Sequence, residues 1–223
     1  MPPHSLTLTM VGASLLWVGW FGFNAGSNLE ANGLTALAFL NTFIATAAAT
    51  VAWSIVEQVR HGRPSLLGAV TGALAGLVAI TPAAGFASPM GAIILGLIVS
   101  PICYIFVSTV KKAFKYDDSL DVFGVHAIGG IIGAIGTGIL AAPQYGGQGW
   151  YDYTVFPAVA GEYSLGGQVM TQIWAVGVTV LWTGIVSFIL FYAIKAIFGL
   201  RPSVEDERQG LDQTSHGESA YSL

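Results

Sequence analysis

Six long, predominantly apolar stretches follow one another along the chain and constrain its fold more than any other feature. Each is long enough to cross a bilayer as a helix, which takes about 20 mostly apolar residues. Only 9% of the residues are charged, against about 25% in soluble domains. The sequence predicts an all-α, polytopic membrane helix bundle at 1–199 and a polar cytoplasmic tail at 200–223. The predicted spans are 6–26, 33–56, 66–84, 89–110, 122–142 and 169–199.

The basic residues indicate the orientation of these spans. The connections 27–32, 85–88 and 143–168 contain no Lys or Arg. Loops rich in Lys and Arg remain in the cytoplasm, so we expect both ends of this chain at the cytoplasmic face. All eight basic residues lie after the second or fourth span, or at or beyond the end of the sixth: Arg60, Arg63, Lys111, Lys112, Lys115, Lys195, Arg201 and Arg208.

Ionisable side chains at membrane depth are costly and therefore suggest function. His126 lies roughly 7 Å into the fifth span, counted from Asp121 at about 1.5 Å per residue. A neutral imidazole both donates and accepts hydrogen bonds, which suits the passage of a small polar solute or a proton. A structural hydrogen bond to a neighbouring helix is the alternative. Gly129, Gly130 and Gly133 follow at helical spacing, and we expect them to leave the histidine's face bare.

Two acidic residues near the span ends have simpler interpretations. We expect Asp121 to cap the fifth span, with its carboxylate accepting backbone N–H bonds. Glu57 lies near Arg60 at the end of the second span, which favours a structural ion pair. Gly68, Gly72 and Gly76 recur at four-residue spacing and predict close helix packing, although small residues also leave room for a lumen.

The end of the first span is aromatic. Trp20 and Phe23 are three residues apart and share one helix face, and Ser27 follows near the outer surface. Aromatic faces attract cations, and a hydroxyl accepts a bond from an N–H donor. An aromatic belt at the membrane interface is the alternative explanation. No HExxH or GxSxG motif accompanies these residues, so the sequence predicts no enzyme, metal or cofactor, and nothing indicates nucleic-acid binding.

Five stretches, in order along nearly the whole chain, resemble the ammonium transporter family (Amt/Mep/Rh). The resemblance implies an eleven-helix fold of two inverted repeats and a final helix, assembled as a homotrimer in the inner membrane. This chain resembles helices six to eleven, without the first repeat. The stretches are WFGFNAGS (20–27), LAFLNTFIATAAATVAW (37–53), GRPSLLGAVTGALAGLVAITPAAGF (62–86), DDSLDVFGVHAIGGIIGAIGTGI (117–139) and GLRPSVEDERQGLDQTSHGESAY (199–221).

The same resemblance implies roles for individual residues in moving ammonium or ammonia. His126, Phe23 and Trp20 are similar to residues that line the narrow pore, and Ser27 to the hydroxyl of the outer substrate site. An ammonium sensor, or a truncated product that does not conduct, is the alternative. The tail resembles a segment that contacts a neighbouring subunit and takes part in regulation by a PII-type protein, with Gly210, Asp212, His216, Gly217 and Glu218 as its residues.

Overall fold

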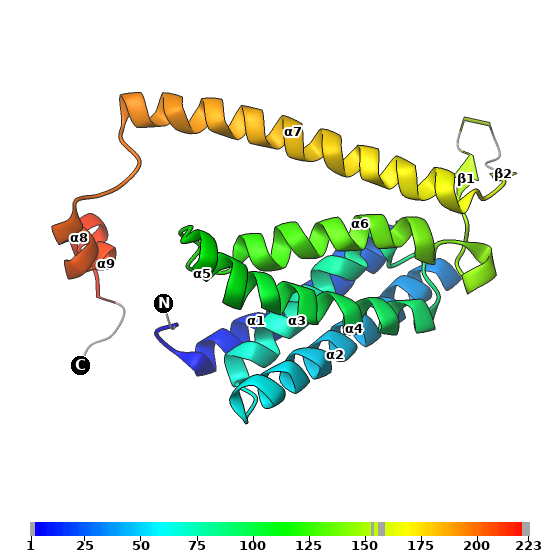
Figure 1. Ribbon diagram of the computed structural model, residues 1–223, viewed down its shortest axis with the longest axis horizontal. Coiled ribbons are helices and arrows are strands. Elements are labelled where there is room, and N and C mark those ends of the chain that lie inside the picture. The colour runs from blue at the N-terminus through cyan, green and yellow to red at the C-terminus, as the bar shows by residue number, and fades with distance from the viewer. Residues whose placement is uncertain (1–2, 153, 156–158, 220–223) are drawn as a thin grey trace. The chain divides into compact units, whose positions relative to one another are not determined.

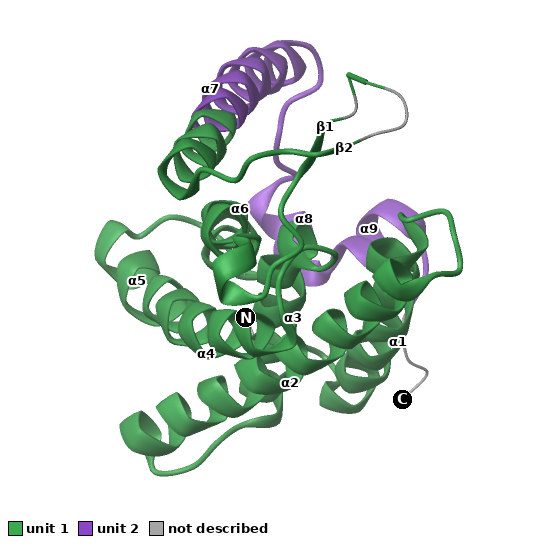
Figure 2. Cartoon of the chain, turned by 90° about the vertical axis from the view of Figure 1, so that its right-hand side faces the viewer, with its two compact units in different colours: residues 1–176 green, residues 177–223 purple. Residues whose placement is uncertain are grey.

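The structure is a computed structural model that describes residues 3–152, 154–155 and 159–219. The chain divides into two compact units, residues 1–176 and 177–223, which Figure 2 colours separately. The first unit contains α1 to α6, a two-stranded hairpin and the start of α7. The second contains the remainder of α7 and two short helices, α8 and α9.

Among the described residues, six helices are long and apolar enough to cross a membrane, which confirms the predicted fold class. Several bounds differ from the prediction. The second helix runs five residues past 56 to His61, the fourth apolar segment continues to Phe114, and α7 begins at residue 165 rather than 169. The long helices are α1 (Leu6–Gly26), α2 (Gly33–His61), α3 (Leu66–Ile80), α4 (Pro89–Ile105), α6 (Ile128–Leu140) and α7 (Leu165–Ile197).

The shorter elements connect or extend these helices. Two π-helical turns, η2 (Phe106–Val110) and η3 (Phe123–Ala127), end α4 and begin α6, with α5 (Lys111–Phe114) after the first. Strands β1 (Tyr151–Asp152) and β2 (Val159–Ala160) pair antiparallel in the connection before α7. The expected polar tail contains two short α-helices, α8 (Val204–Gln209) and α9 (Leu211–His216). Two 3-10 turns, η1 (Thr81–Ala83) and η4 (Pro143–Tyr145), follow α3 and α6.

Local sequence explains where the helices begin and end. Ser5, Asn32, Ser65 and Ser88 precede α1 to α4, and each side chain accepts backbone N–H bonds of the first turn. Such caps satisfy donors that have no partner within the helix. Gly62 ends α2 in the left-handed conformation, with φ +76°, as C-terminal glycines commonly do.

The core of the first unit lies where α2, α3 and α4 pack together, with α1 and α6 alongside (Figure 1). Small residues permit this approach, since a Cβ on Gly76 would lie 2.8 Å from the Ala45 carbonyl oxygen. A Cβ on Gly96 would collide with the same carbonyl. Close packing is the expected use of small residues in membrane helices, and Ser100 adds a 2.7 Å hydrogen bond to the Ala49 carbonyl.

The N-terminus of α1, the α2–α3 turn and α5 lie at one end of the first unit, on the left of Figure 1. We call it the basic end because Arg60, Arg63 and the lysines of α5 belong to it. At the opposite end, the buried Asn41 side chain donates to the carbonyl oxygens of Ala84 and Ala87 at 2.9 and 2.8 Å. These bonds fix the turn between α3 and α4.

Candidate functional site

Trp20 and Phe23 lie on one face of α1, as their spacing predicts. Their rings meet edge to face, with centroids 6.1 Å apart. Together with Leu16 and Gly19 they line a groove of about 300 Å³. The Phe23 side chain is largely exposed in this chain. An exposed aromatic pair along a groove can attract a cation, because the ring faces carry partial negative charge.

Trp20 is held in place by a residue that the sequence did not single out. Its indole Nε1 donates a 2.7 Å hydrogen bond to the Thr81 hydroxyl, 61 residues away along the chain. Thr81 in turn donates to the Leu77 carbonyl at 2.7 Å. This chain of two bonds ties the aromatic face of α1 to the last turn of α3. A threonine beside a proline at the end of an apolar helix gave no signal of that role.

Ser27 caps the C-terminus of α1 at the end opposite the basic end. Its hydroxyl donates to the Phe23 carbonyl at 2.6 Å, and the residue is exposed. A hydroxyl has one donor and two lone pairs, so the oxygen of Ser27 remains able to accept. The role of Ser27 in accepting an N–H from a solute stays a prediction.

His126 belongs to the π-turn η3, at the start of the helical segment that continues as α6. The residue is exposed, and within the described ranges its imidazole makes no hydrogen bond. The expectation that three glycines leave its face bare is wrong for two of them. Gly133 packs directly on the Ala79 carbonyl, and Gly129 lies against Val78 and Cys103; only Gly130 has open space where a side chain would stand.

Asp121 does not cap the helix that carries His126, which corrects the prediction. Its carboxylate accepts a 2.7 Å ion-paired hydrogen bond from Lys111, and its backbone is left-handed, with φ +57°. The cap comes from Asp118 instead. Its two carboxylate oxygens accept the backbone N–H groups of Val122 and Phe123 at 2.8 and 2.9 Å. Asp121 keeps a structural role, but through Lys111.

Glu57 also differs from its expected role. It accepts the backbone N–H of Ser65 at 2.6 Å and the Ser65 hydroxyl at 3.0 Å, rather than pairing with Arg60. Packing explains the difference: α3 crosses the end of α2 at Gly68, where a side chain would collide with the Glu57 carboxylate. The carboxylate thus joins α2 to the beginning of α3.

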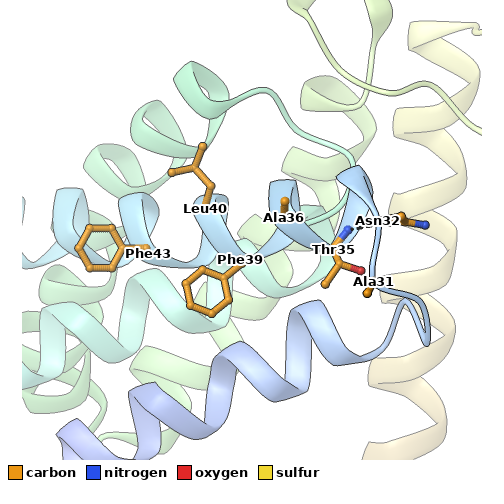
Figure 3. Close-up of a pocket in the computed structure, with 7 residues that line it drawn as sticks. All are labelled: Ala31, Asn32, Thr35, Ala36, Phe39, Leu40 and Phe43. Atoms are coloured by element: carbon orange, nitrogen blue, oxygen red, sulfur yellow. Dashed lines mark hydrogen bonds between the residues drawn. The ribbon is translucent and has the colours of Figure 1, made fainter.

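A second groove, of about 710 Å³, lies along the first turns of α2 (Figure 3). The aromatic side chains of Phe39 and Phe43 project from α2 into it, and Leu40 and the preceding loop complete it. Phe39 also stacks on Phe21 of α1, with centroids 4.1 Å apart. Its lining is almost entirely apolar, so the groove offers little chemistry of its own.

The connection before α7 is ordered by hydrogen bonds around two aromatic residues. The Tyr163 hydroxyl donates to the Gly138 carbonyl at 2.8 Å, and burial raises the pKa of Tyr163. The Trp150 indole donates to the Glu162 carbonyl at 3.2 Å. Nearby, hydrogen bonds from Thr154 to the Asp152 carboxylate lower the pKa of Asp152.

The comparisons with known proteins decide the family. The model of the Ammonium Transporter Family matches residues 1–221. The chain belongs to this family. An ammonium transporter of Aquifex aeolicus is 45% identical over 221 residues, which are 99% of this chain and 50% of that protein. An ammonium transporter of Bacillus subtilis is 44% identical over 219 residues, covering 98% of this chain and 52% of that protein.

Solved structures of the Ammonium Transporter Family agree with the fold. A sensor Amt protein superposes with a TM-score of 0.82 at 32% identity, over 94% of this chain and 49% of that one. The crystal structure of Saccharomyces cerevisiae Mep2 superposes with a TM-score of 0.79 at 32% identity, over 92% of this chain and 45% of that one. The chain spans about half the length of the curated relatives it matches. It is a multi-pass membrane protein of a transporter family.

Within this family frame, the structure groups the expected site residues in two places. Trp20, Phe23 and Ser27 lie at the C-terminal end of α1, while His126 lies in η3. Among the residues that the structure describes, no group of three or more His, Cys, Asp or Glu could hold a metal ion.

The five tail residues share one short structure in the second unit. Gly210 precedes α9 and Gly217 follows it, both with positive φ, and the Glu218 N–H donates to the Asp212 carbonyl at 2.9 Å. His216 is the last residue of the helix. The residues implied by the resemblance therefore lie within α9 or directly at its two ends.

Proposed function

We propose that this chain forms the second half of a transmembrane pathway for ammonium and ammonia. The match of residues 1–221 to the Ammonium Transporter Family is the observation that carries the proposal. The other half of the pathway corresponds to the part of the relatives that this chain does not span. We also propose that the protein lies in the inner membrane with its basic end at the cytoplasmic face. The positive-inside rule supports this orientation.

The site chemistry fits this function at the outer end. An ammonium ion that enters an apolar passage loses its water, which is costly for an unpaired charge. The ring faces of Trp20 and Phe23 offset part of that cost, and the Ser27 oxygen accepts one of the ion's N–H bonds. Because Thr81 holds the Trp20 indole N–H, the ring presents its face in a fixed orientation.

Deeper in the membrane, we infer that the His126 imidazole forms the next hydrogen bonds to the solute. Desolvation favours the neutral form of an amine, so we infer that ammonia continues past the imidazole while the proton follows separately. The imidazole has no hydrogen-bond partner within the described part of the chain and is free to bond a passing solute. It supplies both a donor and an acceptor, as a small molecule with a lone pair and N–H groups requires.

The experiment is a chimera in which residues 1–221 replace the matching half of the Bacillus subtilis relative. We expect this protein to take up ammonium and methylammonium in proteoliposomes, whereas this chain alone gives little or no flux. His126→Ala in the chimera should alter conduction or the selectivity between the two substrates. His61→Ala is the matched control, because His61 bonds to Tyr104 at the basic end and should leave uptake unchanged. Equal uptake and equal selectivity in the unaltered chimera, its His126→Ala variant and its His61→Ala variant would contradict the role of His126.

Ammonium sensing is the second candidate, favoured by the likeness to a solved sensor Amt protein. A chimera that binds ammonium but does not conduct it would support sensing over transport.

We also propose that the complete protein is a homotrimer and that a PII-type protein binds the tail around α9. Removing residues 210–218 from the chimera should abolish PII binding and leave the pathway itself intact.

A further inference from the structure

Two π-turns face each other at the basic end of the first unit. Turn η2 ends α4 and turn η3 begins the helix of His126, and the rings of Phe106 and Phe123 meet with centroids 6.3 Å apart. Gly124 permits the approach, because a Cβ there would lie 2.8 Å from Val107 Cγ2. Turns of this kind are rare, and they occur frequently at functional sites.

A polar clamp holds the backbone immediately before η3. We use this name for Lys111, Asp118 and Asp121. Lys111 binds the Asp121 carboxylate at 2.7 Å and also donates to the Asp118 carbonyl oxygen. The Asp118 carboxylate caps the first two N–H groups of the segment, those of Val122 and Phe123. The side chains of Lys111 and Asp121 are 26% and 28% exposed, so the ion pair is partly accessible to water.

The clamp matters because no hydrogen bond from the described residues fixes the His126 imidazole. The backbone of η3 therefore sets the direction in which this side chain leaves the helix. The following helix is anchored, since Gly133 packs on the Ala79 carbonyl. If η3 relaxed to α-helical geometry, the residues before the end of the turn would rotate by up to about 100° relative to the anchored helix, one residue's turn in a helix of 3.6 residues per turn. His126 would then leave the exposed face.

We propose that Lys111 and Asp118 are positioning residues for His126. They hold η3 in its wide form, and this form directs the imidazole to the face that is open in this chain. The relevance to transport rests on the proposed function, but the position of the imidazole is measurable without any transport. Neither residue touches the solute.

The test is the rate at which diethyl pyrocarbonate modifies His126 in the purified full chain, read by mass spectrometry. His216, in α9, serves as the internal reference among the four histidines. In Lys111→Met and Asp118→Ala we expect the reaction of His126 to slow by about fivefold, which corresponds to the ~1 kcal/mol of a lost helix cap. Lys111→Arg, which keeps the ion pair, should react at the wild-type rate.

Neighbouring residues give matched controls. Lys112 and Asp117 are exposed and make no hydrogen bond in the described structure, so Lys112→Met and Asp117→Ala change the same charges without touching the clamp. If the clamp variants react at the rates of these controls, the proposal is overturned. Should Asp118→Ala fail to fold, Asp121→Asn carries the same expectation, because asparagine tolerates the left-handed backbone and only the ion pair is lost.

Uptake by the chimera separates this inference from the proposed function. Slower modification together with altered ammonium-to-methylammonium selectivity supports both. Slower modification with unchanged uptake leaves the positioning role in place and contradicts His126 as a pathway residue. Altered selectivity without any change in modification contradicts positioning, because the clamp would then act by another route.

Discussion

The Trp20 indole and the Thr81 hydroxyl, 2.7 Å apart, join the aromatic face of α1 to the end of α3. Thr81 sits where the regular helix gives way to the 3-10 turn η1. Its hydroxyl therefore performs two tasks, accepting from Trp20 and donating to the Leu77 carbonyl. A single side chain thus controls the orientation of a residue in the proposed pathway.

Replacing Thr81 by valine keeps its shape and removes the hydroxyl. The Trp20 N–H, which is partly buried, then loses its partner, at a cost of about 1 kcal/mol. We expect the ring to turn and ammonium uptake by the chimera to fall, while Thr81→Ser retains uptake. Trp20 fluorescence in a variant without the other tryptophans reports the ring's environment directly. Equal uptake by the valine and serine variants would show that the bond is dispensable.

The glycines after His126 make a prediction about packing. Gly133→Ala should destabilise the bundle by about 1–3 kcal/mol, the usual cost of overpacking, because its Cβ would collide with the Ala79 carbonyl. Gly130→Ala is the control, since nothing lies within 4 Å of a Cβ there. Thermal unfolding in detergent checks both. A midpoint for Gly133→Ala as high as that for Gly130→Ala would contradict the observed contact.

The fold was largely predictable from the sequence because hydrophobic length is a strong signal in membrane proteins. Runs of apolar residues defined six helices, and Gly68, Gly72 and Gly76 indicated their close packing. Polar partners were not predictable in the same way. Asp118 and Asp121 are three residues apart and equally suited to capping, and only the left-handed backbone of Asp121, which directs its carboxylate to Lys111, distinguishes them.

The surroundings of His126 were mispredicted for a related reason. Helical spacing placed Gly129 and Gly133 beside the histidine, but the π-turn η3 inserts an irregularity that no sequence period reveals. The hydrogen bond between Trp20 and Thr81 joins residues 61 positions apart. Such tertiary pairings depend on how helices cross, which periodicity within one helix does not determine.

Glu57 offers a test between the expected ion pair and the observed contact. Glu57→Ala removes two hydrogen bonds to Ser65 and should lower the free energy of unfolding by about 1–3 kcal/mol, since a typical hydrogen bond contributes about 0.5–1.5 kcal/mol. Arg60→Ala should have almost no effect, because Arg60 does not pair with Glu57 in this structure. Urea unfolding in detergent measures both changes. A larger loss in Arg60→Ala would restore the ion-pair interpretation.

Tyr163 makes a prediction about alkaline pH. Burial raises its pKa above the ordinary value of 10.0, so the folded chain holds the phenolic proton more tightly than the unfolded chain does. The resulting stability is fully present below pH 10.0 and is lost as the pH rises through the folded-state pKa. Ionisation would also remove the donor of the hydrogen bond to Gly138. The midpoint temperature of thermal unfolding should therefore fall more steeply with rising pH in the wild-type chain than in Tyr163→Phe, whose side chain cannot ionise. Tyr145→Phe removes an exposed phenol from the same connection and should preserve the wild-type slope. Parallel curves for wild type and Tyr163→Phe would contradict the link between burial and alkaline stability.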